Sequence, residues 1–225
     1  MDILIRAMEE SNVKDIVDGW NHSLLYDQID ENRFRRVILK DANYEKDSCL
    51  VATYGGKMAG FIAVIAREGI PGADNKGMPQ QKDHGYIKGL FVLDEFRRKG
   101  IASRLLEEAT EYLKSKNKSI IRILEYTGNY FFPGVDTRYE SAIKFFENKG
   151  FGRDHTIDDV DLYITHFEPN DYHQNAKRRA SKIGVSVIDY DPSMLDKMSE
   201  IAHAQKAVYL PPHYRWLENW ATRQV

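Results

Sequence analysis

The most informative segment of the sequence for the fold is Tyr86-Ile-Lys-Gly-Leu-Phe-Val-Leu-Asp-Glu-Phe-Arg-Arg-Lys-Gly-Ile-Ala-Ser-Arg-Leu-Leu106. It begins with an apolar run of β-forming residues that Asp94 ends, and this run predicts a strand. After Gly100, apolar residues recur at steps of three and four, which predicts a helix with one apolar face. Residues 97–99 are all basic. The sequence therefore predicts a strand, a basic glycine turn and a helix.

The basic turn has the chemistry of an anion site. The first N–H groups of a helix have no partner inside it, and the helix dipole places partial positive charge at the same end. Gly100 has no Cβ, so its backbone can approach an anion closely. The spacing matches neither the P-loop nor the dinucleotide-binding glycine pattern. A diphosphate is the ligand that this turn predicts.

The turn resembles the acetyl-CoA signature R/Q-x-x-G-x-G/A of the GNAT superfamily of N-acetyltransferases, through Arg97, Gly100 and Ala102. Two further landmarks of that family occur in the expected order. They are Ile5-Arg6-Ala-Met8 at the start of the chain and Phe146-Glu-Asn-Lys-Gly-Phe151 later. The resemblance implies an α/β fold with a mixed sheet, whose two central parallel strands splay at their C-terminal ends.

The resemblance also implies acetyl-CoA as the cosubstrate. Its pyrophosphate would lie along residues 98–103, and its pantetheine arm would enter between the splayed strands. A backbone N–H near Phe91 or Val92 would stabilise the oxyanion. The cofactor-binding residues implied in this way are Leu90, Phe91, Val92, Arg97, Arg98, Lys99, Gly100, Ile101, Ala102 and Ser103.

The implied reaction is direct attack of a primary amine of an unknown acceptor on the thioester. An amine with a pKa of about 10.4 must lose a proton first, which costs about 4.6 kcal/mol at pH 7. Glu125, at the end of a strand expected over 120–126, is the first candidate for the base, and His84 is the second. A glutamate in an ordinary surface ion pair is the competing interpretation of Glu125.

The proton donor to the leaving thiolate departs from the family pattern. The usual tyrosine of the family's Y-E-K-x-G-F run is Phe146 here, and it has no proton to give. Tyr139 is the candidate in its place, with Tyr126 and Tyr130 as alternatives, and each fits a packed aromatic equally well. The missing tyrosine motivates a rival hypothesis, a non-catalytic acyl-CoA-binding module that acts as a sensor or as half of a tandem protein.

Composition excludes several other classes of protein. The 225 residues carry a formal net charge of -2, with 42% hydrophobic and 29% charged residues, which favours neither nucleic acid nor disorder. The single cysteine, Cys49, permits no internal disulfide and sits in an expected buried strand. No apolar run approaches ~20 residues and no signal peptide is evident, so we expect no membrane partner and a cytoplasmic location. Histidine spacing predicts no metal site.

Three regions are expected along the chain: an acetyltransferase domain over 1–167, a polar linker over 168–182 and an extension over 183–225. In the first, 151–156 and 160–167 are expected to form the closing hairpin, and Thr137-Arg-Tyr-Glu140 a capping box that starts a helix. The extension resembles the start of a second GNAT unit. Its apolar end either docks on its own core or is exchanged with a second subunit in a homodimer.

Overall fold

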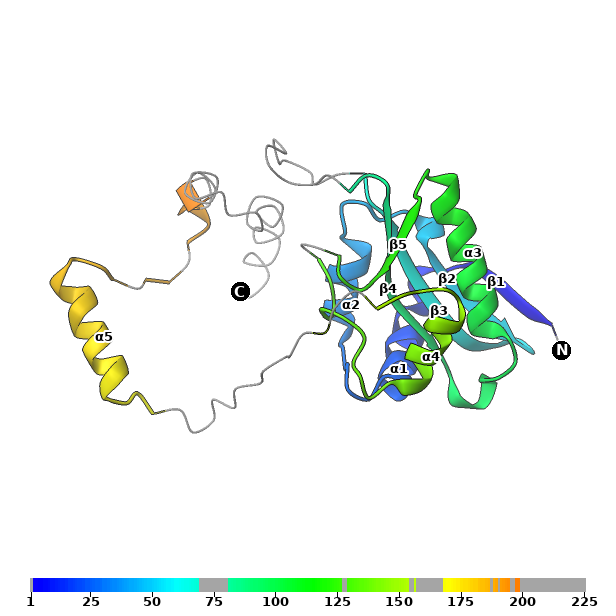
Figure 1. The fold of residues 1–225 in the computed structure, drawn as a ribbon, viewed down its shortest axis with the longest axis horizontal. Helices are drawn as coiled ribbons and strands as arrows, with labels where there is room; N and C mark the ends of the chain where they lie inside the picture. Colours follow the sequence, from blue (N-terminus) through cyan, green and yellow to red (C-terminus); the bar gives the residue numbers. More distant parts are fainter. Residues whose placement is uncertain are drawn as a thin grey trace.

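The computed structural model describes residues 2–68, 81–126, 129–153, 156, 168–186, 188–189, 191–194 and 197–198 (Figure 1). Its strands are β1 (Ile3–Ala7), β2 (Cys49–Tyr54), β3 (Lys57–Ala66), β4 (His84–Val92) and β5 (Ile120–Ile123). Its α-helices are α1 (Val13–Ser23), α2 (Glu31–Phe34), α3 (Ile101–Ser115), α4 (Glu140–Asn148) and α5 (Asp171–Lys182). Shorter turns are η1 (Glu10–Asn12), the π-helical η2 (Arg35–Leu39), η3 (Lys46–Ser48), η4 (Asp94–Phe96) and η5 (Pro192–Met194).

A five-stranded sheet in the order β1-β2-β3-β4-β5 organises the described residues. The first four strands pair antiparallel with their neighbours, whereas β5 pairs parallel to β4. A parallel pair needs a crossover connection, which α3 supplies. The predicted mixed sheet with one parallel pair is confirmed.

Helices cover both faces of this sheet. On one face, α1 and α2 share a buried core with the strands that contains Trp20, Phe34, Phe61 and Phe91. On the other face, α3 and α4 share a second core that contains Ile62, Ile87, Leu105, Leu113 and Phe146. Figure 1 shows α3 running along the strands. The strand and helix on either side of the basic turn are thus both anchored in core.

Strand β5 is shorter than the sequence predicted. It ends at Ile123, and the next residue, Leu124, has a φ of 65°. A non-glycine residue in the left-handed region does not continue a strand. The chain therefore leaves the sheet before Tyr126, where the strand was expected to end.

Helix α4 also begins later than expected. Tyr139 is the residue before its first turn, and no side chain caps it. The predicted capping box is therefore wrong, and Asp136 instead accepts the backbone N–H of Arg138 at 2.8 Å. Gly150, with a φ of 89°, ends the helix as predicted, while the N–H of Phe151 donates to the carbonyl of Phe146 at 3.1 Å.

The segment predicted as a polar linker contains helix α5. The side chain of Asn170 caps it by accepting the N–H of His173 at 3.3 Å, and alanine, lysine and arginine favour helix inside it. No residue of α5 is buried, and the helix lies apart from the sheet in Figure 1. Most of the expected closing hairpin, and residues 199–225, lie outside the described residues. The three predicted regions stay predictions.

Gly89 fixes how closely α1 approaches β4. A Cβ on Gly89 would lie 2.3 Å from Cη2 and Cζ3 of Trp20. We expect Gly89→Ala to lower the free energy of unfolding by about 1–3 kcal/mol, since it overpacks the core. Urea denaturation measures the change. Gly134→Ala is the matched control, because its Cβ meets nothing within 4 Å. Equal losses in the two variants would contradict the close approach.

Candidate functional site

The turn between β4 and α3 leaves a series of backbone donors without acceptors. Gly100 precedes α3 with a φ of 82°, and no side chain caps the helix. Within the part of the chain that the structure describes, the N–H groups of residues 98–103 donate to no protein acceptor. Residues 97–100 are exposed, so a ligand can reach the turn. Such donors at the positive end of a helix suit a diphosphate.

The basic side chains of the turn differ in how they are held. Arg97 is tied back, because its Nε donates to the carbonyl of Val92 at 3.1 Å and its Nη2 lies 2.8 Å from Asp94. Lys99 donates to the carbonyl of Glu95 at 2.6 Å. The guanidinium of Arg98 contacts no charged partner among the described residues. Arg98 is therefore the side chain of this turn best placed to turn towards an anion.

The pairing of the parallel strands stops at Ile87, before β4 ends at Val92. Their register runs from His84↔Ile120 to Ile87↔Ile123, and the N–H of Leu124 donates a last hydrogen bond to the carbonyl of Ile87 at 2.8 Å. β4 continues to Val92, paired only with β3 among the described residues. Backbone groups in a sheet normally find partners. The opening beyond Ile87 thus offers hydrogen bonds to an extended ligand.

The predicted donor-binding residues of β4 lie along this opening. Phe91 packs with the α1 and α2 core, while Leu90 and Val92 pack on the α3 side. Ile101, Ala102 and Ser103 form the first turn of α3, with Ile101 buried beneath it. In the chain, the unpaired end of β4 is thus followed directly by η4 and the free N–H groups of the turn.

Glu125 follows β5 at the edge of the opening. Its carboxylate lies 2.7 Å from Nη1 of Arg122, and its side chain is 42% exposed. An exposed ion pair of this kind stabilises a fold by about 0–1 kcal/mol. The surface ion pair that competes with a catalytic role for Glu125 is therefore present, and the carboxylate is also reachable by solvent.

Tyr139 joins the segment before α4 to the loop between α1 and α2. Its hydroxyl oxygen accepts the backbone N–H of Tyr26 at 2.8 Å, and the two rings lie 5.2 Å apart. Burial raises the pKa of Tyr139 above its ordinary value, so the phenol is protonated at neutral pH. The O–H of Tyr139 has no hydrogen-bond acceptor among the described residues.

His84 occupies the opposite end of β4 from the opening. It is the first residue of the strand, its Cα pairs with that of Ile120, and its Nδ1 lies 2.8 Å from Oδ1 of Asp83. This placement separates His84 from the end of β4 where the strands part. Phe146 is buried against Phe145 and Phe151, with ring centroids 5.3 and 5.4 Å away, as an apolar core residue.

A buried polar cluster at the opening was missed from the sequence. Lys88 of β4 forms an ion pair with Asp41, and Tyr126 and Asn129 bond to the same carboxylate. The signal was a lysine inside an apolar strand, because lysine is almost never fully buried without a partner. Its partner is 47 positions away in sequence, so no local pattern identifies it.

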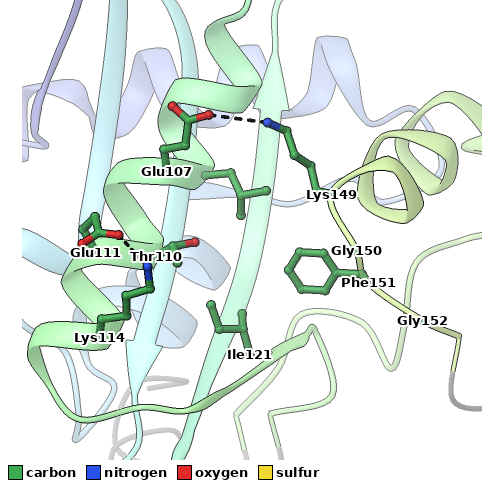
Figure 2. Close-up of a pocket in the computed structure, with 10 residues that line it drawn as sticks. Glu107, Thr110, Glu111, Lys114, Ile121, Lys149, Gly150, Phe151 and Gly152 are labelled. Atoms are coloured by element: carbon green, nitrogen blue, oxygen red, sulfur yellow. Dashed lines mark hydrogen bonds and ion pairs between the residues drawn. The ribbon is translucent and has the colours of Figure 1, made fainter.

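A separate cavity of about 520 Å³ lies between α3, β5 and the end of α4. Figure 2 shows Glu107 and Lys149 joined across it, with Ile121 and Phe151 on its apolar side. None of the predicted site residues lines it. It is therefore distinct from the turn and the opening.

Among the described residues, no group of three or more histidine, cysteine, aspartate or glutamate side chains gathers with metal-binding geometry. None of the helices in that part of the chain is both long and apolar enough to cross a bilayer.

Residues 5–151 match the family described as acetyltransferase (GNAT) family, and the chain therefore belongs to it. An "Uncharacterized N-acetyltransferase" of Archaeoglobus fulgidus is 31% identical over 102 residues, which are 44% of this chain. The match spans 60% of the length of that relative.

Solved structures agree with this fold. Arabidopsis thaliana Naa50, in complex with the bisubstrate analogue CoA-Ac-MVNAL, is similar with a TM-score of 0.51 and 21% identity, over 74% of this chain and 93% of that one. AAC(6')-Iy, in complex with the bisubstrate analogue CoA-S-monomethyl-acetylneamine, has a TM-score of 0.51 and 16% identity, over 72% and 99%. At these identities the likeness establishes the fold.

Substitution of Gly100 should lower the affinity for CoA by more than its effect on the stability of the fold explains. We expect Gly100→Ala to weaken CoA binding at least about tenfold, because alanine resists a φ of 82° and its methyl group projects from the turn. Isothermal titration calorimetry measures the affinity. Gly56→Ala is the matched control, since Gly56 has a φ of 80° and also faces open space. Equal affinity in the two variants would argue against an anion at the turn.

Cys49 should not react with thiol reagents in the folded protein. Burial raises the pKa of its thiol to about 12, so almost no thiolate exists at pH 8. We expect no reaction with 5,5′-dithiobis(2-nitrobenzoate) in native buffer and one equivalent in guanidinium chloride, followed by absorbance. Fast reaction of the native protein would contradict the burial of Cys49 at the start of β2.

Proposed function

We propose that this protein is an N-acetyltransferase that moves an acetyl group from acetyl-CoA to a primary amine. The observation that carries the proposal is the adjacency of two features: unpartnered N–H groups at residues 98–103 and an opening between β4 and β5 beyond Ile87. Together they suit a ligand with a diphosphate at one end and an amide-containing arm at the other. Acetyl-CoA, the cosubstrate, has this form and supplies an activated thioester.

We assign separate tasks to three groups in the proposed reaction. Glu125 takes a proton from the acceptor ammonium, so that the neutral amine can form the new N–C bond. A backbone N–H of β4 near Phe91 or Val92 donates to the oxyanion as the bond forms. The C–S bond then breaks, and Tyr139 gives its phenolic proton to the thiolate. The attacking nitrogen loses its second proton, which returns to the Tyr139 phenolate through solvent, and Glu125 releases the first proton to solvent, so that one proton is set free per amide formed.

A second candidate, a CoA-binding module without catalysis, has one observation in its favour. Phe146 fills the place of the family's tyrosine within apolar packing. Acetyl-CoA-dependent release of free thiol, tested with a panel of primary amines, separates the two candidates. CoA binding without amine-dependent thiol release would leave only the second. The acceptor, a cytoplasmic location and a homodimer stay predictions.

Tyr139→Phe tests the proton donor. We expect kcat to fall by about 10²-fold or more, because phenylalanine keeps the ring against Tyr26 and removes the proton. The rate of thiol release at saturating acetyl-CoA and amine measures kcat. Tyr172→Phe, in the exposed helix α5, is the control for losing a hydroxyl. An unchanged kcat in Tyr139→Phe would move the role to Tyr126 or Tyr130.

A further inference from the structure

The opening between β4 and β5 begins at an unusual residue. The first position of β4 beyond its last pair with β5 is Lys88. It lies in a β-bulge, because the register with β3 passes from Val64↔Ile87 to Ala63↔Gly89 and leaves Lys88 without a partner. The bulge aims this lysine at the α2 side of the sheet, where its ammonium contacts Val37 and Asp41.

The Lys88 ammonium is completely enclosed. Its side chain is 0% exposed and that of Asp41 is 2% exposed, with Nζ to Oδ2 at 2.7 Å. Nζ also donates to the carbonyl of Val37 at 2.5 Å and lies 4.7 Å from the centroid of the Tyr126 ring. Burial lowers the pKa of Lys88, and Asp41 opposes that change. No solvent screens the pair.

Asp41 gathers donors from both sides of the opening. Its Oδ2 accepts from Lys88 and from Nδ2 of Asn129, the latter at 2.7 Å. Its Oδ1 accepts the hydroxyl of Tyr126 at 3.3 Å and the backbone N–H of Asn43 at 2.9 Å. Lys88 belongs to β4, whereas Tyr126 and Asn129 belong to the chain that has left β5. The two walls of the opening are therefore joined through one carboxylate.

Three backbone irregularities meet at this cluster. They are the bulge at Lys88, the left-handed Leu124 and the π-helical turn η2, whose Val37 carbonyl accepts from Lys88 and Asn129. Irregular backbone of this kind is concentrated at functional sites. A buried ion pair seldom stabilises a fold more than apolar side chains of the same shape, although each of its bonds is directional. The cluster thus fixes geometry more than it adds stability.

Asn129 adds an observation that points to a ligand. Its Oδ1 is buried and accepts no hydrogen bond among the described residues. A buried acceptor without a donor is unfavourable, and a ligand amide can satisfy it. The arm of the proposed cosubstrate carries amide N–H groups and would pass between these same walls.

We propose that the Lys88–Asp41 pair is a spacer that holds β4 and the chain after β5 apart, and so positions the pantetheine arm of the donor. This inference rests on the proposed function. Because Lys88 on one wall and Tyr126 and Asn129 on the other all bond to the Asp41 carboxylate, the bonds to that carboxylate set the separation of the two walls. Lys88 and Asp41 are positioning residues and need not touch the reacting atoms.

Two ligands distinguish binding of the pantetheine arm from binding of the diphosphate at the turn. CoA reaches both, whereas 3′-phosphoadenosine 5′-diphosphate, which is CoA without its arm, reaches only the turn. We expect Lys88→Met to raise the ratio of their dissociation constants, CoA over the nucleotide, by about tenfold, with the nucleotide affinity unchanged. Calorimetric titration of the full-length protein measures both constants. Asp41→Asn keeps the shape of the carboxylate and should shift the ratio in the same direction.

Lys118→Met is the matched control. Lys118 is another buried lysine, whose Nζ donates to the carbonyls of Arg67 and Lys82 at 2.7 and 2.8 Å and to Glu68 at 2.6 Å. It precedes β5, at the end where the parallel strands are paired. We expect Lys118→Met to lower the melting temperature and to leave the ratio of dissociation constants unchanged, because a general loss of stability weakens the binding of both ligands alike.

The outcomes separate the spacer from the proposed function. An unchanged ratio in Lys88→Met and Asp41→Asn, with wild-type protein binding both ligands, overturns the spacer alone. An equal rise in Lys118→Met also overturns it, because the effect would then follow stability. Wild-type protein that binds neither ligand removes the donor site itself, and the proposed function fails with it. If Lys88→Met does not fold, Asp41→Asn decides.

Discussion

The structure depends on one constraint, the early end of hydrogen bonding between two parallel strands. β4 and β5 are paired only up to Ile87 and Ile123, and Leu124 then turns the chain away through a positive φ. Backbone donors and acceptors that lose a strand partner need another one. A sheet normally avoids this loss, so its presence beside a helix start with free N–H groups indicates a binding site built from backbone. The side chains around it differ mainly in how they hold that backbone.

The sheet and its two cores supply the packing that stabilises the fold despite this loss of strand pairing. β3 supports β4 along its whole length, and α3 is fixed beneath it by Ile101, Leu105 and Leu113, all buried. The turn between β4 and α3 is therefore held at both ends by packing, although residues 97–100 are exposed. A binding loop positioned by a rigid scaffold loses little conformational entropy when a ligand binds.

An ion pair with both side chains buried lies where the strands part. The Lys88–Asp41 pair replaces the missing strand pairing with directional bonds to η2 and to the chain after β5. Removing ions from water is costly, and an apolar filling would tolerate several arrangements of the two walls. A carboxylate that accepts hydrogen bonds from four donors permits few arrangements of the two walls. Tyr139 also restricts geometry, because its hydroxyl oxygen accepts the backbone N–H of Tyr26 in the loop between α1 and α2.

The residue pattern alone predicted the strand, turn and helix over 86–106, because hydrophobic periodicity and glycine turns act over a few residues. The mixed sheet and the family were predicted through the resemblance of short motifs. Tertiary structure alone decided where β5 stops, that α4 starts after Tyr139 without the predicted cap, and that Lys88 meets Asp41. These features depend on contacts between segments far apart in the chain. Lys88 stands out locally as a lysine in an apolar strand, but no local pattern identifies Asp41, 47 positions away, as its partner.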